Sequence, residues 1–423
     1  MYDQSFCKKT LERVLQKRDF VGITKTSAAQ KAFRDDILNK AVASARSRFD
    51  DPPIHLEKFT LNQRTVFSFP NLNDELVARK LCENIKRSQK IATSGRSQIV
   101  SNLRLLLEEG VPYRIYRLDI RSFYESFSQQ DVLSAVNELP RLSPHSKILL
   151  EKLFAFHKHM GGHGLPRGLS LSATLADLLM QDFDLGMKSS DDVFFYARYV
   201  DDIIVVTSSR EKPLTLIRAI EELLPTGLQL NPNKKQVVGP LGKVSPIKAN
   251  MPTTELFKFD YLGYAFRVEE PVKNSAKRPG EHHRGVTIDI AQNKIKRFKT
   301  KIARSFLEFG KTGNWNLLKD RIKFLTKNFS VYNVKAGGKK IAGIFYSYPL
   351  VSDSAEGLRM LDDFLRNAIL SKSGPIYTMS SPKLKGSEKR ELLSHSFARG
   401  HKEKSFVHFS GNRIQEIQSC WTN

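Results

Sequence analysis

Two separate segments of the sequence place aspartates beside apolar runs. Asp201 and Asp202 lie within VFFYARYVDDIIVVTS, whose Val, Ile, Phe and Tyr residues predict a β-hairpin with its turn near residues 199–202. Asp119 closes VPYRIYRLDI, which alternates as a strand does, just before a segment of helical pattern. These aspartates are far apart in the chain, so only folding can bring them together.

An adjacent pair of carboxylates between apolar strands requires a compensating cation. Mg²⁺ is the natural candidate, because it takes hard oxygen ligands and keeps waters and substrate phosphates in its shell; Mn²⁺ is the alternative. Two such ions can lower the pKa of an attacking 3′-hydroxyl and stabilise a leaving pyrophosphate. A solvated turn would explain an Asp-Asp pair alone. The apolar strands and the upstream segment favour a metal site of Asp119, Asp201 and Asp202.

The charge of the chain indicates a polyanionic partner. Among 423 residues, of which 40% are hydrophobic, 68 are basic and 44 acidic, a formal net charge of +24. Lysine and arginine near phosphates release condensed counterions, so nucleic acid is the expected partner. A membrane is not expected, because no apolar run is long enough to span a bilayer.

The cysteines and the N-terminal segment favour a cytoplasmic location. MYDQSFCKKTLERVLQKRDF lacks the apolar stretch of a signal peptide and reads as an ordinary helix. Cys7, Cys82 and Cys420 are far apart and show no CxxC pairing, so neither a disulfide framework nor a zinc site is expected. The histidines between residues 157 and 163 surround glycines and are expected to form a solvated loop.

Hydrophobic periodicity divides the chain into three segments. Residues 1–105 are expected to be mainly helical and basic, and residues 106–270 to alternate two β-hairpins with helices, as in an α+β domain. Residues 271–423 are expected to be helical and basic, with ten Lys or Arg against two acids between Lys273 and Arg304. Residues 380–404 are polar and are expected to be partly mobile.

Five motifs resemble, in order and spacing, those of reverse transcriptases: DIRSFY at 119–124, LPRGLSLS at 165–172, YVDD at 199–202, LQLNPNK at 228–234 and FDYLGY at 259–264. The resemblance covers about residues 90–270. It implies a right-hand polymerase with fingers and N-terminal helices in 1–105, a palm of antiparallel sheet and helices in 106–270, and a basic thumb and C-terminal RNA-binding region in 271–423. It also implies dNTPs as substrates, an RNA template and a DNA product.

The resemblance assigns roles to residues around the carboxylates. The Ile120 carbonyl would assist the metal ligands. Tyr124 matches the aromatic gate that lies under the sugar and excludes a ribose 2′-hydroxyl, although a core tyrosine remains the alternative. Lys234 matches a lysine near the triphosphate that can protonate the leaving pyrophosphate, and Lys235 remains open for the same role.

Further residues match the motifs that contact the nucleotide and the primer. Leu262 and Gly263 match the primer grip, a tight turn beside the primer end. Arg167 stands where reverse transcriptases usually carry Gln, and could bind a phosphate or pair with an acid; Gly168 allows close backbone approach to the nucleotide. Arg96 resembles the fingers arginine that clamps the triphosphate, since guanidinium suits bidentate phosphate binding. Lys90 and Arg104 remain alternatives to Arg96.

A basic helix is expected after residue 290. We expect its cations to follow the phosphates of a duplex, with a solvated basic face as the alternative. Phe298 and Phe306 on the same helix are expected to be core residues. The cations are Lys294, Lys296, Arg297, Lys299, Lys301 and Arg304.

The combination of motifs resembles most closely bacterial defence-associated reverse transcriptases, including their abortive-infection relatives. The resemblance implies antiphage action with a dedicated noncoding RNA, and a second reverse transcriptase subunit or a homo-oligomer as partner. A retron or group II intron-like enzyme is the alternative, although neither a VTG element nor a splicing domain is recognised. A nonenzymatic RNA-binding scaffold with a polymerase fold is opposed by the three aspartates, and an RNA-dependent RNA polymerase by Tyr124.

Overall fold

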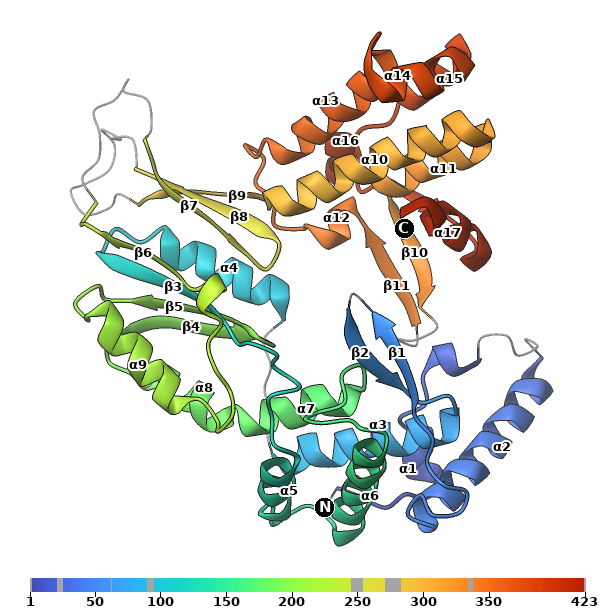
Figure 1. Ribbon diagram of the computed structural model, residues 1–423, viewed down its shortest axis with the longest axis vertical. Helices are drawn as coiled ribbons and strands as arrows, with labels where there is room; N and C mark the ends of the chain where they lie inside the picture. Colours follow the sequence, from blue (N-terminus) through green and yellow to red (C-terminus); the bar gives the residue numbers. More distant parts are fainter. Residues whose placement is uncertain are drawn as a thin grey trace. The chain divides into compact units, whose positions relative to one another are not determined.

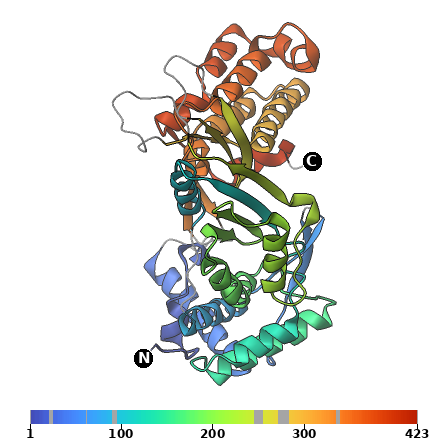
Figure 2. The ribbon, with the colours of Figure 1, turned by 90° about the vertical axis from the view of Figure 1, so that its left-hand side faces the viewer.

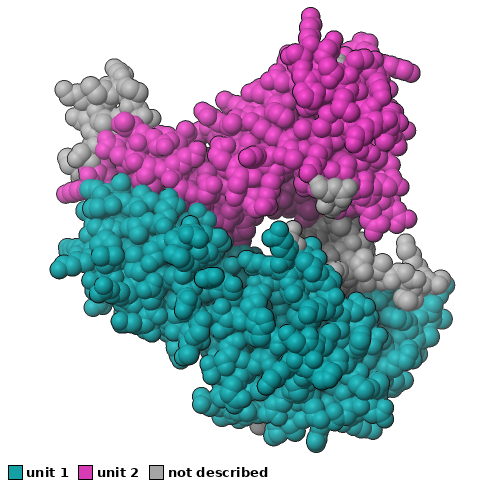
Figure 3. All heavy atoms as spheres, viewed as in Figure 1, with its two compact units in different colours: residues 1–95, 112–242 teal, residues 96–111, 243–423 magenta. Residues whose placement is uncertain are grey.

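The computed structural model describes residues 2–20, 26–61, 63–89, 95–244, 254–270, 283–333 and 338–421. The chain divides into two compact units, one of residues 1–95 and 112–242 and one of residues 96–111 and 243–423 (Figure 3). The units cut across the three expected segments, because helix α4 (Arg96–Leu107) packs against a strand of the second unit. The division into fingers, palm and thumb therefore stays a prediction.

The first unit is built on an antiparallel sheet of four strands in the order β4-β5-β3-β6 (Figures 1 and 2). The two inner strands are buried almost along their whole length, and β5 is accordingly apolar from Ile203 to Val206. Helix α8 packs against β4 and against α9. The bounds are β3 (Tyr113–Asp119), β4 (Val193–Tyr199), β5 (Asp202–Thr207), β6 (Gln236–Leu241), α8 (Gln181–Lys188) and α9 (Pro213–Leu223).

The remaining helices of this unit share one large apolar core with the sheet. Several begin at a Ser or Thr whose side chain accepts a hydrogen bond from the first turn, as Thr26, Ser128 and Ser143 do for α2, α5 and α6. These helices are α1 (Lys8–Glu12), α2 (Ser27–Arg46), α3 (Leu72–Ser88), α5 (Gln129–Asn137), α6 (Pro144–His159) and α7 (Ser170–Leu179), with short 3₁₀ turns at Lys17–Phe20 and Pro232–Lys234.

The expectation that residues 1–105 are mainly helical misses an antiparallel hairpin, β1 (Glu57–Leu61) with β2 (Arg64–Ser68). Polar and apolar residues alternate in EKFTL and RTVFS, which is the period of a strand, but each run has only five residues. Such short strands are easily overlooked between two long amphipathic helices. The hairpin matters below, because it borders a cavity.

Two other expectations for this unit are corrected. Residues 121–127 form turns, with Ser122 at a φ of 47°, and the helix after Asp119 begins only at Gln129. The segment GLPRGLSLSATLADLLMQDFDLGM predicts a Gly/Pro loop followed by one long apolar helix, but it forms two helices, α7 and α8, which are separated at Met180.

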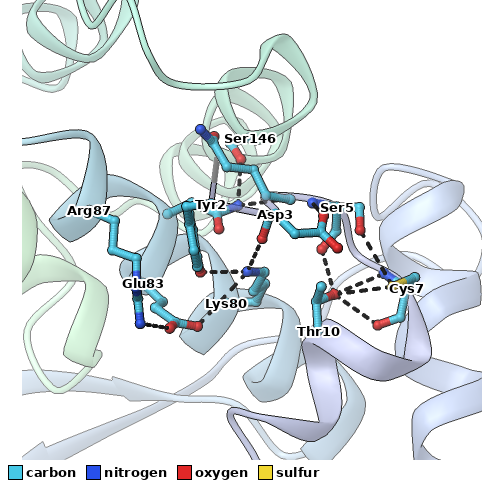
Figure 4. Close-up of polar contacts among 11 residues, drawn as sticks. Tyr2, Asp3, Ser5, Cys7, Thr10, Lys80, Glu83, Arg87 and Ser146 are labelled. Atoms are coloured by element: carbon cyan, nitrogen blue, oxygen red, sulfur yellow. Dashed lines mark hydrogen bonds and ion pairs between the residues drawn. The ribbon is translucent and has the colours of Figure 1, made fainter.

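The first residues of the chain are hydrogen-bonded to side chains of α3 (Figure 4). Lys80 is fully buried, and its ammonium donates to the Tyr2 hydroxyl at 2.6 Å and to the Asp3 carbonyl at 2.9 Å. Asn84 donates to the Gln4 carbonyl and to the Ser146 hydroxyl, both at 3.0 Å. A buried ammonium is tolerated only when such acceptors replace its water. The expected N-terminal helix is accordingly short, because the first residues are extended along α3.

His157 is not in a solvated loop, contrary to expectation. It lies fully buried at the end of α6, with Nδ1 2.8 Å from the Gln129 amide nitrogen and its ring edge-on to Phe67. Its Nε2 has no hydrogen-bond partner among the described residues. Burial lowers the pKa of His157 to about 4, and the charges of His163 and Lys58 add to this.

The lowered pKa of His157 predicts that acid destabilises the fold. The unfolded chain takes up a proton at this histidine near pH 6.5, whereas the folded chain does so only near pH 4. The free energy of unfolding should therefore be greatest above pH 6.5 and fall as the pH approaches 4. Chemical denaturation of His157→Phe should show a weaker decline over this range, and His159→Phe, exposed on the same helix, serves as control. An identical decline in His157→Phe would contradict the assignment.

The second unit has two small sheets. One is antiparallel, in the order β7-β8-β9, and the other has the order β11-β10-β12, in which β10 and β12 are parallel. Helices α13 and α4 both contact β9. The strands are β7 (Glu255–Tyr261), β8 (Tyr264–Glu269), β9 (Gly285–Ile290), β10 (Asn328–Asn333), β11 (Gly338–Gly343) and β12 (Phe406–His408).

Helix α10 is the centre of the helical part of this unit, with α11, α13 and α14 packed around it (Figures 1 and 2). It ends at Gly313, whose φ of 67° suits glycine and whose N–H donates to the Phe309 carbonyl. The helices are α10 (Gln292–Thr312), α11 (Trp315–Thr326), α12 (Ile344–Ser347), α13 (Gly357–Leu370), α14 (Gly374–Ser380), α15 (Gly386–Leu393), α16 (Phe397–Lys402) and α17 (Gly411–Gln418), with 3₁₀ turns at Ser381–Lys383 and Ser419–Trp421.

The C-terminal segment is less uniformly helical than expected. The basic helix begins at Gln292, because the preceding residues pair with β8 as strand β9, and the helix α11 ends at Thr326, where β10 follows. Part of residues 380–404, expected to be mobile, forms α15 and α16, and Asp362 accepts hydrogen bonds from the first turn of α16. The polar and charged stretch KNSAKRPGEHHRG at residues 273–285 predicts an exposed loop, and it lies almost wholly outside the described residues.

The α+β class is confirmed by these sheets and helices. None of the helices in the described ranges is both long and apolar enough to cross a membrane. Cys7, Cys82 and Cys420 are free thiols, as their separation in the sequence predicts.

Candidate active site

The three aspartates meet at one end of the sheet in the first unit. Asp119 is the last residue of β3 and lies opposite Asp202, the first residue of β5. Ile120 donates its N–H to the Asp201 carbonyl at 3.0 Å and also pairs with Leu230 in an isolated bridge. Folding thus brings together the two segments that the sequence separates.

The turn that carries Asp201 is strained. Tyr199 and Asp202 are paired, so Val200 and Asp201 form a two-residue connection between β4 and β5. Val200 has a φ of 61°, which is costly for a β-branched residue. Such strain persists only where surrounding contacts impose it, and it is found most often at functional sites.

The side chain of Arg198 is hydrogen-bonded to the backbone of this turn. Its side chain is only 6% exposed, and its guanidinium pairs with Asp184 at 2.8 and 2.9 Å and with Asp177 at 3.2 Å. Its Nη1 donates to the Val200 carbonyl at 3.2 Å. A rigid guanidinium fork fixed by two carboxylates therefore sets the position of the peptide that precedes Asp201.

We predict that Arg198→Gln slows nucleotide incorporation by about 100-fold with little change in KM, because small displacements of catalytic groups have effects of this size. Arg198→Lys, which keeps the charge but loses the fork, should lie between the two. Single-turnover kinetics measures the rate, and thermal unfolding checks that the variants are folded. Tyr196→Phe is the matched control, since Tyr196 bonds Asp184 without an observed contact to the turn. A folded Arg198→Gln variant of wild-type rate would contradict the positioning role.

The three carboxylates lie close enough for their negative charges to interact. Burial raises the pKa of both Asp201 and Asp202, and the carboxylates around each add to the rise: Asp119 for Asp201, and Asp201 and Asp119 for Asp202. Arg167 and Lys234 act in the opposite sense on Asp201 but do not cancel it. A cation placed among these oxygens would remove this repulsion.

Lys234 and Asn231 contact the innermost of these aspartates. The Lys234 ammonium lies 2.6 Å from Asp119 Oδ1, and the Asn231 amide donates to Oδ2 at 3.0 Å. Lys235 instead pairs with Glu221 at 3.3 Å. Of the two lysines that the sequence leaves open, Lys234 is the one at the carboxylate cluster. Its chemical role stays a prediction.

The donor set fits a hard divalent cation, although it is not a preformed cage. No three His, Cys, Asp or Glu side chains within the described ranges are arranged to hold a metal ion by themselves, and the Lys234 ammonium lies against Asp119. Carboxylates such as Asp201 and Asp202, whose pKa values are raised by burial and by neighbouring carboxylates, are nevertheless what Mg²⁺ stabilises, and Mg²⁺ completes its shell with waters and phosphates. Metal binding by Asp119, Asp201 and Asp202 stays a prediction.

Tyr124 lies beside the cluster, between its neighbour Phe123 and Arg167. It is partly buried, burial raises its pKa, and Asp201 is among the charges that act on it. The Arg167 guanidinium is 5.1 Å from the centre of its ring. Arg167 also pairs with Glu125 through two hydrogen bonds, at 2.8 and 3.0 Å. Of the two partners considered for Arg167, a phosphate or an acid, the structure contains the acid.

A cavity of about 370 Å³ opens beside Arg167 and Glu125. Its lining includes basic residues that the sequence did not single out as site residues. One wall is the hairpin of β1 and β2, with Lys58 and Arg64, and another is formed by Ser122, Glu125 and Arg167. A wall rich in cations suits an anionic ligand. The alternation of EKFTL and RTVFS, with its two basic residues, is the sequence feature that could have revealed it.

Gly168 has a packing reason to be glycine. Its φ is 104°, and a Cβ there would lie 2.5 Å from the Phe67 carbonyl and 2.6 Å from the Val66 side chain. The neighbouring Arg167 carbonyl accepts a hydrogen bond from the Phe67 N–H at 2.7 Å. The close approach is thus to strand β2, and a nucleotide contact at Gly168 stays a prediction.

The second unit contains the turn expected to grip the primer. Leu262 and Gly263 connect β7 to β8 with φ values of 48° and 81°, the backbone of a tight hairpin turn. Tyr261 and Tyr264 on either side are fully buried, as a core role requires. The primer-grip role itself stays a prediction.

Arg96 supports this turn. It donates to the Leu262 carbonyl and to the Ser347 carbonyl, both at 2.8 Å, and its guanidinium lies 4.6 Å from the ring centre of Tyr264. The ring centre of Tyr348 lies 5.6 Å from the same guanidinium. Two carbonyls and two tyrosine rings of the second unit therefore surround Arg96. A role in clamping the triphosphate is untested. Of the alternatives, Arg104 pairs with Glu108, and Lys90 lies outside the described residues.

The cations of α10 differ in exposure. Lys296 and Arg297 are exposed, whereas Lys294 is half-buried, with its side chain near the Leu262–Gly263 turn. Lys301 lies 4.9 Å from the Trp421 ring centre, and burial lowers its pKa. Phe306 is buried, as expected, and Phe298, half-buried, stacks edge-on against Phe397. Contact of these cations with nucleic acid stays a prediction.

Comparison with known proteins identifies the class of the segment that contains all five motifs. Residues 62–266 match the family model described as reverse transcriptase (RNA-dependent DNA polymerase). The chain therefore carries a reverse transcriptase domain, which is the domain of RNA-directed DNA polymerases, a class of nucleotidyltransferases. The matched range contains Asp119, Asp201, Asp202 and Lys234 as well as the Leu262–Gly263 turn.

The chain is also similar to two solved structures of fungal telomerases. The apo telomerase of Candida tropicalis, truncated from its C-terminal domain, is 13% identical with a TM-score of 0.32, over 58% of this chain and 48% of that one. The telomerase of Candida albicans in complex with a fragment of telomeric RNA is 16% identical with a TM-score of 0.31, over 81% and 53%. This chain thus spans about half the length of each. No curated protein matches it.

Proposed function

We propose that this protein is an RNA-directed DNA polymerase whose nucleotidyl transfer takes place at the carboxylate end of the β4-β5-β3-β6 sheet. The observation that supports this most directly is the pairing of Asp119 with Asp202, with Asp201 joined to the same end through Ile120. These residues come from two motifs of the matched domain. Carboxylates gathered from distant segments favour an enzyme over a scaffold that only binds RNA.

Asp119, Asp201 and Asp202, with the Ile120 carbonyl, would hold the divalent cations. When bound, two Mg²⁺ ions lower the pKa of a primer 3′-hydroxyl and stabilise the pyrophosphate that leaves. Arg198 fixes the backbone at Val200 and so keeps two of these carboxylates in position. The contribution of the chain is thus orientation of the ligands before substrate arrives.

Lys234 would donate a proton to the leaving pyrophosphate. Its ammonium is bound to Asp119, but half of its side chain is exposed, so it can exchange this carboxylate for a phosphate oxygen. Asn231 retains its own hydrogen bond to Asp119 and would hold that side chain during the exchange. The group that carries the proton would therefore stay close to the reacting phosphates.

The basic cavity would receive the triphosphate. Lys58 and Arg64 provide cations that the sequence analysis did not identify, and Arg167 on the opposite wall acts electrostatically on Asp201. Tyr124 lies between this wall and the aspartates, where it would contact the sugar and exclude a 2′-hydroxyl. We favour the cavity over Arg96, because Arg96 is already bound by two carbonyls.

The second unit would bind the template and primer. The Leu262–Gly263 turn would approach the primer end, and the exposed Lys296 and Arg297 would contact phosphates together with Lys294. A formal charge of +24 supports a polyanionic partner. Lys301 would contribute less, since it lies against Trp421.

The biological role that we propose is bacterial antiphage defence in the cytoplasm, with a dedicated noncoding RNA as template and a second reverse transcriptase subunit or another copy of the chain as partner. The resemblance of the motifs to defence-associated enzymes supports it. A retron or group II intron-like enzyme is the second candidate within the same family.

Sequencing the nucleic acids that copurify with the protein from its host tests this role, with Asp201→Ala as control. The proposal expects one noncoding RNA together with complementary DNA, and the RNA alone with the variant. A mixture of unrelated RNAs would contradict a dedicated template. RNA without complementary DNA in both samples would favour a scaffold.

A further inference from the structure

The Arg167–Glu125 pair lies in the wall of the basic cavity, beside Tyr124. The pair is bidentate, through Nε to Oε1 at 2.8 Å and Nη2 to Oε2 at 3.0 Å. Its carboxylate belongs to the residue that follows Tyr124, and its guanidinium lies over the Tyr124 ring at 5.1 Å. Glu125 is thus joined to Tyr124 through the backbone, and Arg167 contacts the ring of Tyr124.

The pair is firmly formed. Burial would raise the pKa of Glu125, but the hydrogen bonds and charge of Arg167, with a contribution from Arg64, outweigh it and lower that pKa. Side-chain exposures of 21% for Arg167 and 30% for Glu125 place the pair in a partly desolvated wall of the cavity. Bidentate pairs of this kind also fix orientation, since both groups are planar.

The loop that carries Arg167 is anchored without its side chain. The Leu165 N–H donates to the Tyr124 carbonyl at 2.8 Å, and the Arg167 carbonyl accepts from the Phe67 N–H at 2.7 Å. Gly164 lies so close to the chain opposite that a Cβ would be 2.6 Å from the Tyr124 carbonyl. Substitution of the Arg167 or Glu125 side chain thus leaves the backbone framework in place.

We propose that the Arg167–Glu125 pair holds the Tyr124 ring in position and thereby sets the discrimination between deoxyribonucleotides and ribonucleotides. This inference rests on the proposed function, in which Tyr124 faces the sugar. A ring excludes a 2′-hydroxyl only if it cannot turn aside, and a cation stacked on its face opposes that movement. Arg167 and Glu125 are positioning residues that act through Tyr124.

The experiment measures kcat/KM for one dNTP and its matching rNTP, in primer extension on an RNA template, for wild type, Arg167→Gln, Glu125→Gln and the double variant. Each single variant should lower the dNTP:rNTP ratio of kcat/KM about 3- to 10-fold, chiefly by lowering KM for the rNTP. The double variant should resemble either single one, because both substitutions remove the same pair.

Further variants separate the positioning role from other roles. In a Tyr124→Ala background, Arg167→Gln should no longer change the ratio, because the ring on which it acts is absent. Asp50→Asn and Lys152→Gln break an exposed ion pair of the same unit, at 2.8 Å, and should leave the ratio at the wild-type value. Arg167→Lys, which lacks the planar fork, should fall between wild type and Arg167→Gln.

Equal increases of KM for dNTP and rNTP would overturn the inference, because they are the sign of direct phosphate binding by Arg167. An unchanged ratio in folded Arg167→Gln and Glu125→Gln proteins would overturn it as well. Failure of the wild-type protein to incorporate either nucleotide would be a different result: it would overturn the proposed function, and this inference with it.

Discussion

Asp201→Asn is expected to lower nucleotide incorporation more than about 100-fold, while RNA binding stays close to that of the wild type. Loss of groups that merely orient metal ligands lowers metal affinity or activity roughly 10- to 100-fold, so loss of a direct ligand should exceed this. The substitution keeps the size of the side chain but removes a negative charge from a cluster in which burial and neighbouring carboxylates raise the pKa of Asp201 and of Asp202. Relief of that repulsion should leave the fold intact or slightly more stable.

Primer extension at several Mg²⁺ concentrations measures the effect, with RNA binding followed in parallel by fluorescence anisotropy. Asp202→Asn should behave in the same way. Asp50→Asn, an exposed aspartate of the same unit, should retain wild-type activity. Synthesis by Asp201→Asn at the wild-type rate would remove Asp201 from the set of metal ligands.

Tyr124→Ala is expected to reduce discrimination against ribonucleotides by roughly 10- to 100-fold, which is the range available from steric selection by a single side chain. Removal of the ring leaves space for a 2′-hydroxyl between the Arg167 wall and the aspartates. Incorporation of dNTPs should persist at a reduced rate, since the ring also limits the freedom of the bound sugar. The ratio of kcat/KM values for dNTP and rNTP measures the change.

Tyr124→Phe is the matched control for this experiment. It keeps the ring and the stacking of Arg167 while removing the hydroxyl, so discrimination should remain near the wild-type value. If Tyr124→Ala kept full discrimination while its fold was intact, Tyr124 would be a core residue and another group would select the sugar.

The parts of the site that could be predicted from the sequence are those encoded by short contiguous patterns. Asp201 and Asp202 lie between two runs of strand pattern, and Asp119 closes a third, so local periodicity alone places all three at a strand end or in the adjoining turn. The register of β3 against β5 brings these ends together. The Leu262–Gly263 turn was predictable for the same reason, since it lies between two runs of strand pattern.

The parts that could not be predicted depend on contacts between distant segments. The sequence near Arg96 suits a phosphate clamp, but the partners of its guanidinium are carbonyls at Leu262 and Ser347, more than 150 positions away. Lys301 reads as one of several equivalent cations on a helix, until Trp421 at the end of the chain covers it. No local pattern contains this information.

The β1–β2 hairpin and His157 were missed for a related reason. Each strand of the hairpin is only five residues long, so the neighbouring amphipathic helices dominate any window that includes it. Nearby glycines suggest a loop at His157, whereas the ring of Phe67 and the amide of Gln129 enclose it in the folded chain. The basic cavity beside the hairpin was missed with it.

The central claim is tested most directly by RNA-templated DNA synthesis with the purified wild-type protein. The measurement is extension of a labelled primer annealed to an RNA template, with dNTPs and either Mg²⁺ or Mn²⁺, next to the same reaction with rNTPs. The account predicts a DNA product that depends on the template, on dNTPs and on the divalent cation, and little product with rNTPs. Tight RNA binding without extension under any of these conditions, or extension with rNTPs alone, would contradict it.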